Sequence, residues 1–560
     1  MGYNYWNGTE AAHRRVMMKA AGYSDEDIRQ KPHIGIPNSY MAGSPGTAHL
    51  RQVTEAVKEG IWAAGGIPVE FGIPATCGNV ANGADEMKYE QVGRDIVAMS
   101  IEFVSRIHNF DAICCVASCD LIIAGCYLAA CRLDIPALVV TGGSMQAGNY
   151  CGKTVVEADL DAARFSGASE AELFEMEESV CPSFGACPSM GTANTMQMLG
   201  EVLNLVMPGT STIPASDNAR LRAARTAGKY MVQLARSGKT AKDLITKDVL
   251  ENAIMFDMAV AGSTNAVLHI LAYAYELGIK LTLADFEKYA KEIYCINAVI
   301  PSGPYTVVDF HYAGGVKQVM KQLAGKIHTD APTIYGDTTW GELLDSVKSA
   351  PNKVIHSLED PVAKEPGLKI MRGNISPAGA IVRPTAVYEE VKYIKGAAKV
   401  YECDQDAYKA IMAGEIVAGD ILVIRYEGCK GAPGMKELML SIDALIGLGL
   451  DKKVGLITDA RFSGFNYGAI VGHVSPEAYD GGVIALIENG DEIEMDIAGG
   501  TVNLLVSDEI LAERRKSWVR PPLKQQKGVL NIYAQNCRPA EEGGAMQPWA
   551  LDADYGYHHE

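Results

Sequence analysis

Residues 111–125 read DAICCVASCDLIIAG and carry the pattern that decides the fold of the N-terminal part of the chain. A short apolar run ends in the polar pair Cys119-Asp120, and a second apolar stretch follows directly. Continuous apolar runs of this length are typical of strands buried on both faces of a parallel sheet. Because ligands bind beyond the carboxyl ends of such strands, the sequence places Cys119-Asp120 where a ligand would bind.

The same pattern recurs on both sides of this stretch. Further apolar runs span residues 33–39, 68–77 and 136–144, and amphipathic segments separate them. This alternation predicts βαβ units and a mostly parallel sheet. The runs end at Asn38-Ser39, Cys77 and Ser144. We therefore expect these residues to meet Cys119-Asp120 at one edge of the sheet.

The character of the chain changes near residue 370. From about 180 to 370 helical periodicity dominates, and within 181–207 and 261–278 a Gly- and Ser/Thr-rich loop leads into a helix. Short apolar runs separated by Gly turns follow, which indicates a β-rich region. We predict two domains, an N-terminal α/β domain over 1–370 and a C-terminal β-rich domain with a helical and irregular tail over 371–560.

Composition argues against several classes of protein. The formal net charge of −18, with Lys and Arg scattered, argues against a nucleic-acid partner. No run approaches the roughly 18 apolar residues of a membrane span. The start MGYNYWNGTE lacks the features of a signal peptide, so we expect a cytoplasmic protein. Thirteen cysteines in 560 residues are too sparse for a disulfide scaffold, so most are expected to be buried thiols.

Seven motifs in order give the chain a family resemblance. They are Cys119-Asp120, GACPSMGTANTM, AGSTNAVLH, PGMKEL, TDARFSG, GHVSPEA and LLVSDEILAERR. With them, the sequence resembles the dihydroxy-acid and sugar-acid (phosphogluconate-type) dehydratase family over about residues 8–535. The resemblance implies an α/β fold with a C-terminal β-barrel-like domain, an active site between the domains, and a homodimer or homotetramer. It also implies a hydro-lyase that converts a 2,3-dihydroxy or sugar acid to a 2-keto-3-deoxy acid.

Such a dehydration has two chemical demands. A proton beside a carboxylate must be removed, which requires a cation to stabilise the doubly charged intermediate. Hydroxide must also leave, and it is a poor leaving group unless a Lewis acid holds it. In the family an iron-sulfur cluster holds the hydroxyl, Mg²⁺ faces the carboxylate, and a serine acts as the base.

The resemblance assigns these roles to five residues. Two cluster cysteines fall on Cys119 and Cys187, two magnesium ligands on Asp120 and Glu437, and the catalytic base on Ser463. Cys187 lies in a loop before a helix, whose N-terminus would favour the thiolate. For Ser463 the alternative role is a turn serine that caps a helix.

Three metal ligands expected from the resemblance are missing. Gly46 stands at the first cluster cysteine, Gly78 at the other magnesium aspartate, and Leu121 at the lysine that becomes a carboxylated ligand. Cys77, beside Gly78 at the sheet edge, is a candidate replacement thiolate, although a cysteine that only packs is the alternative.

We therefore expect Cys77, Cys119 and Cys187 to hold a cluster with one open iron, [4Fe–4S] in preference to [2Fe–2S]. For magnesium only Asp120 and Glu437 remain. Mg²⁺ often binds through one or two carboxylates, so a site there is one expectation. The other is that these two acids only hydrogen-bond the substrate.

Strand ends and helix starts supply the candidate substrate contacts. These are Asn38, Ser39, Ser144, Ser263, Thr264 and Asn265, with helix capping as the alternative role for Ser263, Thr264 and Asn265. Phe465-Asn466-Tyr467 replace the small and basic residues usual in the family, which predicts an unusual substrate. Two alternatives to the dehydratase stay open. One is an elimination or isomerisation without the standard metal site, and the other is a catalytically silent homologue that binds a sugar acid.

Overall fold

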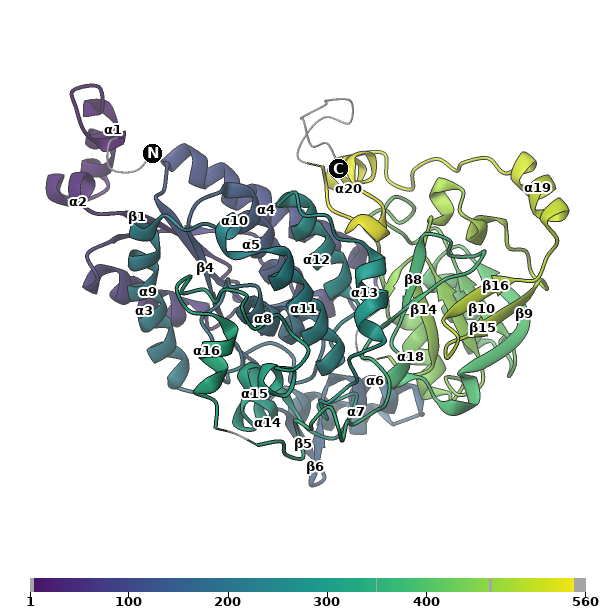
Figure 1. Cartoon of the computed structure of the whole chain (residues 1–560). Helices are drawn as coiled ribbons and strands as arrows, with labels where there is room; N and C mark the ends of the chain where they lie inside the picture. Colours follow the sequence, from purple (N-terminus) through teal and green to yellow (C-terminus); the bar gives the residue numbers. More distant parts are fainter. Residues whose placement is uncertain (1–4, 349, 463–465, 548–560) are drawn as a thin grey trace.

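A four-stranded parallel sheet forms the centre of the N-terminal part of the chain (Figure 1). The computed structural model describes residues 5–348, 350–462 and 466–547. The strands, in spatial order, are β2 (Ile67–Gly72), β1 (His33–Asn38), β3 (Ala112–Ala117) and β4 (Ala137–Thr141). Their registers bring the carboxyl ends together, because Asn38 pairs with Gly72 and Val116. The predicted βαβ arrangement is confirmed.

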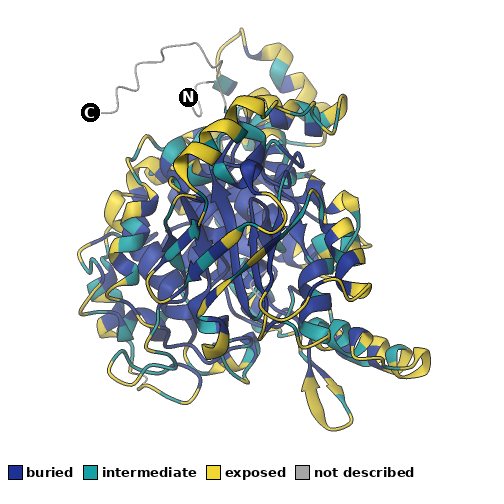
Figure 2. Ribbon diagram, turned by 90° about the vertical axis from the view of Figure 1, so that its right-hand side faces the viewer, coloured by how far each residue is buried: buried dark blue, intermediate teal, exposed yellow. Residues whose placement is uncertain are grey.

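Helices cover both faces of this sheet because successive side chains of a strand point in opposite directions. Cys114 and its neighbours Ala112 and Val116 pack against α3 (Leu50–Ala63) and α9 (Ala219–Ser237). Cys115, on the opposite face, packs toward α4 (Tyr89–His108) and α5 (Asp120–Leu133). Figure 2 shows that the interior of the molecule is buried, in dark blue, and that exposed segments, in yellow, lie mostly on its outside.

Two glycines allow α3 and α9 to cross at close range. A Cβ atom on Gly60 would lie 2.1 Å from the Arg225 carbonyl oxygen, and one on Gly228 would lie 2.2 Å from that of Val57. Such backbone approach is open only to a residue without a side chain. This crossing fixes α3 against the sheet.

A second helical layer lies outside α5. It consists of the buried helices α8 (Thr192–Val202), α11 (Lys247–Val260) and α12 (Asn265–Glu276). The other elements of the N-terminal part are α1 (Ala12–Ala20), α2 (Asp25–Gln30), β5 (Gly148–Tyr150), β6 (Lys153–Val155), α6 (Glu157–Phe165), α7 (Glu170–Val180), α10 (Ala241–Leu244), α13 (Leu283–Ala290), α14 (Val307–Tyr312), α15 (Gly315–Gln322) and α16 (Trp340–Asp345).

An eight-stranded sheet builds the C-terminal part and curls into a nearly closed barrel. Its spatial order is β16 (Thr501–Leu504), β15 (Glu492–Asp496), β9 (Tyr393–Tyr401), β10 (Ile421–Ile424), β12 (Gly455–Thr458), β14 (Ala469–Ser475), β8 (Gly379–Val382) and β7 (Lys369–Met371). A bridge between Arg372 and Thr501 joins the two edges. The expected α/β fold with a barrel-like second sheet is confirmed, and the domain boundary at residue 370 stays a prediction.

The remaining elements of the C-terminal part lie outside this sheet or connect it to the N-terminal part. They are α17 (Asp404–Met412), β11 (Glu437–Leu438), α18 (Leu440–Gly447), β13 (Arg461–Phe462), α19 (Asp508–Ser517) and α20 (Gly528–Asn536). Helix α18 packs against α6, and Phe165 of α6 enters the apolar core around Leu445. This contact brings the two parts together beside the end of the parallel sheet.

Among the helices of residues 5–348, 350–462 and 466–547, none has the length and apolar character of a membrane span.

Candidate functional site

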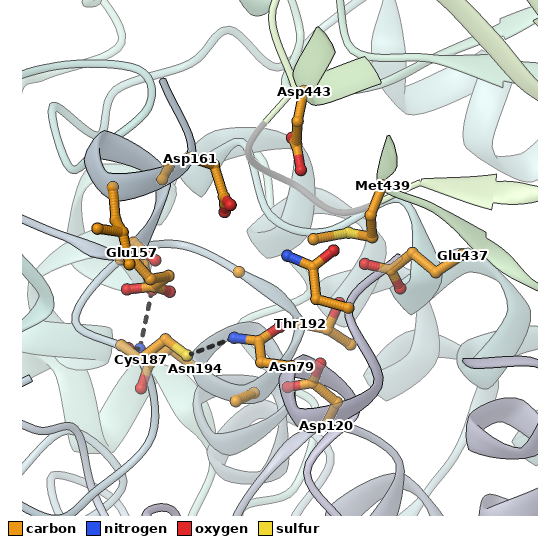
Figure 3. Close-up of a pocket in the computed structure, with 16 residues that line it drawn as sticks. Asn79, Asp120, Glu157, Asp161, Cys187, Thr192, Asn194, Glu437, Met439 and Asp443 are labelled. Atoms are coloured by element: carbon orange, nitrogen blue, oxygen red, sulfur yellow. Dashed lines mark hydrogen bonds between the residues drawn. The ribbon is translucent and has the colours of Figure 1, made fainter. Parts of the chain in front are cut away.

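A pocket of about 240 Å³ opens where the parallel sheet meets the C-terminal part (Figure 3). Its walls come from the start of α5, the loop over residues 79–82, the Cys187 loop, the start of α8, helix α6, strand β11 and helix α18. Asp120, Cys187 and Glu437 line it together. Three of the residues predicted to carry chemistry thus face one cavity.

Cys119 stands at the carboxyl end of β3, directly before α5. Its backbone adopts a φ of 75°, a conformation that is uncommon for residues other than glycine. Its thiol interacts with the thiol of Cys77, which follows β2 at the same sheet edge. The structure therefore brings these two predicted cysteines into contact.

The hydrogen bond between the two thiols shifts their pKa values in opposite directions. It lowers the pKa of Cys77 to about 7, and the backbone amides of Asn79 and Val80 act in the same direction. The same bond, with burial, raises the pKa of Cys119. Because thiolates are the metal-binding form, Cys77 offers a ligand near neutral pH.

Cys187 reaches the pocket from the loop before α8. The Asn79 amide donates to its sulfur at 3.5 Å (Figure 3), and Asn194 donates to its carbonyl oxygen at 2.5 Å. The predicted effect of the helix N-terminus is wrong, because α8 begins only at Thr192. Burial and the nearby Glu157 carboxylate instead raise the pKa of the Cys187 thiol.

The three sulfur atoms are spread more widely than the ligands of one metal ion. Among the described residues, the group whose donor atoms all lie within 4.8 Å of one another is Asp248, Glu251 and His328, far along the chain from the three cysteines. A single tetrahedral ion with bonds of about 2.3 Å to sulfur needs a tighter set. Cys77, moreover, lines a neighbouring cavity of about 230 Å³. The donor set suits a group of several atoms rather than one ion.

Gly46, where the resemblance expects a cysteine, lies against Cys119. A Cβ atom on Gly46 would be 3.4 Å from both the Cβ and the Sγ atoms of Cys119. The vacant position thus borders the same sulfur that Cys77 contacts. Position 46 and Cys77 therefore both lie next to the Cys119 thiol.

A buried network of acids around Arg461 lies behind the pocket wall at Glu437. Strands β11 and β13 pair in register, which sets Glu437 opposite Arg461. The Arg461 guanidinium, fully buried, donates to Glu437 at 3.0 Å and to Glu90 at 2.9 Å. Its Nε atom donates to the Met435 carbonyl oxygen at 2.9 Å.

The charges of this network shift the proton affinities of its acids. Burial, followed by the charges of Glu90 and Glu437, raises the pKa of Asp120 well above its usual range. Burial raises the pKa of Glu437 to about 7, although Arg461 opposes this shift. Both shifts favour the protonated forms of these acids in the absence of a bound cation.

Three further acids form the outer wall of the pocket (Figure 3). Glu157 and Asp161 come from α6 and Asp443 comes from α18. Burial, then the charge of Asp161, raises the pKa of Asp443 to about 8. One Glu157 carboxylate oxygen is buried without a hydrogen-bond partner among the described residues. No lysine or arginine is among the described residues that line this pocket.

The six candidate substrate contacts lie behind the pocket walls. Asn38, Ser39, Ser144, Ser263, Thr264 and Asn265 are all buried, and none of the six lines the pocket. Asn38 donates to Glu70 at 2.9 Å, Ser144 donates to the Met145 carbonyl oxygen at 3.1 Å, and Asn265 donates to Thr192 at 3.0 Å. These bonds hold the strand ends and loops in place, and substrate contact by these residues stays a prediction.

Ser463, the predicted base, lies outside the described residues. The described chain reaches Phe462 at the end of β13, whose carbonyl oxygen accepts a hydrogen bond of 3.5 Å from Thr264. Its role as a base stays a prediction.

Sequence reasoning missed Glu90, Glu157, Asp161 and Asp443. Glu90 lies in the first turn of α4, where an acid is ordinarily favoured by the helix dipole. Asp161 and Asp443 lie on helices, where charged residues usually face solvent. No local pattern in the sequence distinguished them from such residues.

Comparison with known proteins covers nearly the whole chain. The family model described as dihydroxy-acid/6-phosphogluconate dehydratase N-terminal matches residues 31–342, and its C-terminal counterpart matches residues 353–544. A dihydroxy-acid dehydratase of Caldanaerobacter subterraneus subsp. tengcongensis is 42% identical over 96% of this chain and 98% of its own length. Dihydroxy-acid dehydratases of Ignicoccus hospitalis and Pyrococcus abyssi are 43% and 42% identical, each over 96% of this chain and 98% of its own length.

Proposed function

This chain belongs to the dihydroxy-acid/6-phosphogluconate dehydratase family, and from that premise we propose that it converts a polyhydroxylated carboxylic acid to a 2-keto-3-deoxy acid. It is a hydro-lyase that acts on dihydroxy acids. The observation that carries the proposal is the convergence of Cys187, Asp120 and Glu437 on one pocket beside the Cys77–Cys119 pair. These groups are of the kinds that elimination of hydroxide requires.

The three cysteines fit an iron-sulfur cluster as its ligands. Three thiols at one sheet edge, too widely spaced for a single ion, match the donor chemistry of a cluster. A thiol with a pKa of about 7 at Cys77 favours loading. Such a [4Fe–4S] cluster, when bound, would supply an open iron as the Lewis acid for the substrate hydroxyl.

The residues of the chain orient the substrate and manage its protons. Asn79, Asn82 and Thr192 present amide and hydroxyl groups to the pocket. The Asp120 carboxyl, whose pKa is raised by burial and by the neighbouring acids, lines the pocket and can hydrogen-bond a substrate oxygen. Ser463, directly after β13, is the proposed base for the proton beside the substrate carboxylate.

The acidic outer wall supports a hydroxyl-rich substrate. Asp161 and Asp443 present carboxyl oxygens, which accept hydrogen bonds from alcohols whether or not the group is protonated. A purely alkyl substituent would leave these oxygens desolvated and unpaired, which is costly. We therefore favour a sugar acid over an acid with a branched alkyl chain.

The test is to purify the chain without oxygen, measure iron and acid-labile sulfide per chain, and assay a panel of sugar acids and alkyl dihydroxy acids for keto-acid formation. About four iron and four sulfide per chain, with turnover of sugar acids, is the expected result. Two of each would point to the smaller cluster. Protein that binds a sugar acid without iron or turnover after reconstitution would instead be a silent homologue.

Light scattering on the same material tests the proposed homodimer or homotetramer. A particle of twice or four times the chain mass is expected. A monomer at working concentration would contradict the proposal.

A further inference from the structure

Position 78 is filled by a side chain from another element. A Cβ atom on Gly78 would lie 2.1 Å from one carboxylate oxygen of Glu90 and 2.6 Å from its carboxyl carbon. An aspartate at 78 would overlap with this group, so the chain cannot hold both acids in these places. The acid expected in the loop after β2 is thus replaced by one from the first turn of α4.

Glu90 is engaged by a cation that the chain itself supplies. Arg461 donates to Glu90 at 2.9 Å and to Glu437 at 3.0 Å, one bond from each terminal nitrogen. Only 7% and 8% of the two glutamate side chains are exposed, so both charges would be costly without this partner. Charge-assisted bonds of this kind are strong and directional.

The remaining donors do not make up a magnesium site. Mg²⁺ demands nearly octahedral oxygen ligands at about 2.0–2.1 Å. Glu90, Asp120 and Glu437 do not have donor atoms that all lie within 4.8 Å of one another. Leu121, where a carboxylated lysine is expected, offers no donor and packs in the core at 3% exposure.

We propose that the Arg461 guanidinium, anchored by Glu90, takes the place of the divalent cation, so that the site neutralises its acids without Mg²⁺. This inference rests on the proposed function of the pocket and concerns only its second cation. Glu437 then serves as an ion-pair partner of Arg461, and Asp120 remains the acid that faces the substrate. Arg461 is a positioning residue, because it acts through Glu437 and Glu90.

The test is magnesium binding by the intact, anaerobically purified protein after treatment with EDTA. Calorimetric titration with MgCl₂ is expected to give no saturable binding. The melting temperature in MgCl₂ is expected to equal that in NaCl of the same ionic strength. Saturable binding of one Mg²⁺ per chain would overturn the proposal.

The Glu90→Gln variant identifies the role of the acid. Its melting temperature should fall by the same amount with and without Mg²⁺. Glu276→Gln is the matched control, because it breaks the buried Arg132–Glu276 pair away from the pocket. If Glu90→Gln instead removed a magnesium-induced rise seen in the unsubstituted protein, Glu90 would be a metal ligand and the proposal would be wrong.

The test separates this inference from the proposed function. Iron and sulfide content with keto-acid formation decide the latter, whereas magnesium binding is measured without turnover. An active iron-sulfur enzyme that binds Mg²⁺ would contradict only the inference. An iron-free, inactive protein would contradict the proposed function, and the titration would still decide the inference.

Discussion

The thiol side and the acid side of the pocket have each lost an expected metal ligand, and they differ in what stands in its place. Gly46 offers no thiol beside Cys119, and Cys77 supplies one from the loop after β2. At Gly78 the missing acid is replaced by Glu90, which pairs with Arg461. The thiol side keeps a thiol ligand, supplied by Cys77 from a different position. On the acid side, the Arg461 guanidinium takes the place of a bound metal ion.

This difference follows from what each side must supply. No protein side chain can replace an iron Lewis acid, so this side must keep donors for the cluster, and thiolates are its usual protein ligands. Balancing two buried carboxylates, in contrast, requires a positive charge and hydrogen-bond donors, which a guanidinium provides. We therefore expect the thiol side to depend on added metal and the acid side to be independent of it.

The largest effect should come from Cys119 on the thiol side. Cys119→Ala is expected to abolish iron and sulfide binding and the visible absorption of the cluster, because its sulfur contacts Cys77 and borders Gly46. Cys114→Ala is the control, since that cysteine lies in β3, the strand that precedes Cys119, but packs in the core. Full iron content in Cys119→Ala would exclude a cluster at this site.

Cys77 tests the relocated ligand directly. Cys77→Ala should lose most of the bound iron, and Gly46→Cys in the same chain should restore it, because a side chain at 46 would lie 3.4 Å from the Cys119 sulfur. Iron and sulfide analysis with the visible spectrum measures both. If Cys77→Ala keeps its iron, Cys77 is only a packing residue, and the thiol side has no relocated ligand.

On the acid side the expected effect is on stability. Arg461→Met should lower the free energy of unfolding by about 3–5 kcal/mol, because it leaves two buried carboxylates without their partner. Urea unfolding of the intact protein measures this loss. Arg132→Met is the control for a buried pair outside the pocket, and an Arg461→Met variant as stable as the unsubstituted protein would contradict the stand-in role.

The sequence predicted the thiol side better than the acid side for a physical reason. Cys77 and Cys119 follow apolar strands, and the parallel registers of β1 with β2 and β3 bring those strand ends together. Glu90 and Arg461 are 371 positions apart and belong to different parts of the fold. Only the tertiary fold, which brings the Arg461 guanidinium to the Glu90 carboxylate, makes them partners, and no local period in the sequence encodes this contact.

The smallest effect concerns the outer wall, where Asp443 tests whether its acids carry protons. Its pKa is raised from 3.8 to about 8, mainly by burial. Between these values the folded chain holds a proton that the unfolded chain has released. The contribution of Asp443 to the free energy of unfolding is therefore largest below pH 3.8, falls as the pH rises, and is lost above about pH 8.

Asp443→Asn should therefore make the unfolding free energy fall less steeply between about pH 5 and pH 8, as measured by urea unfolding at each pH. The slope should shrink without vanishing, because Glu437 and Glu477, with pKa values of about 7 and about 8, contribute in the same direction. Asp406→Asn, at an exposed acid whose pKa is lowered by Lys409, should leave the slope unchanged in this range. A slope in Asp443→Asn equal to that of the unsubstituted chain would mean that Asp443 is ionised, and the outer wall would then carry full negative charge against any carboxylate substrate.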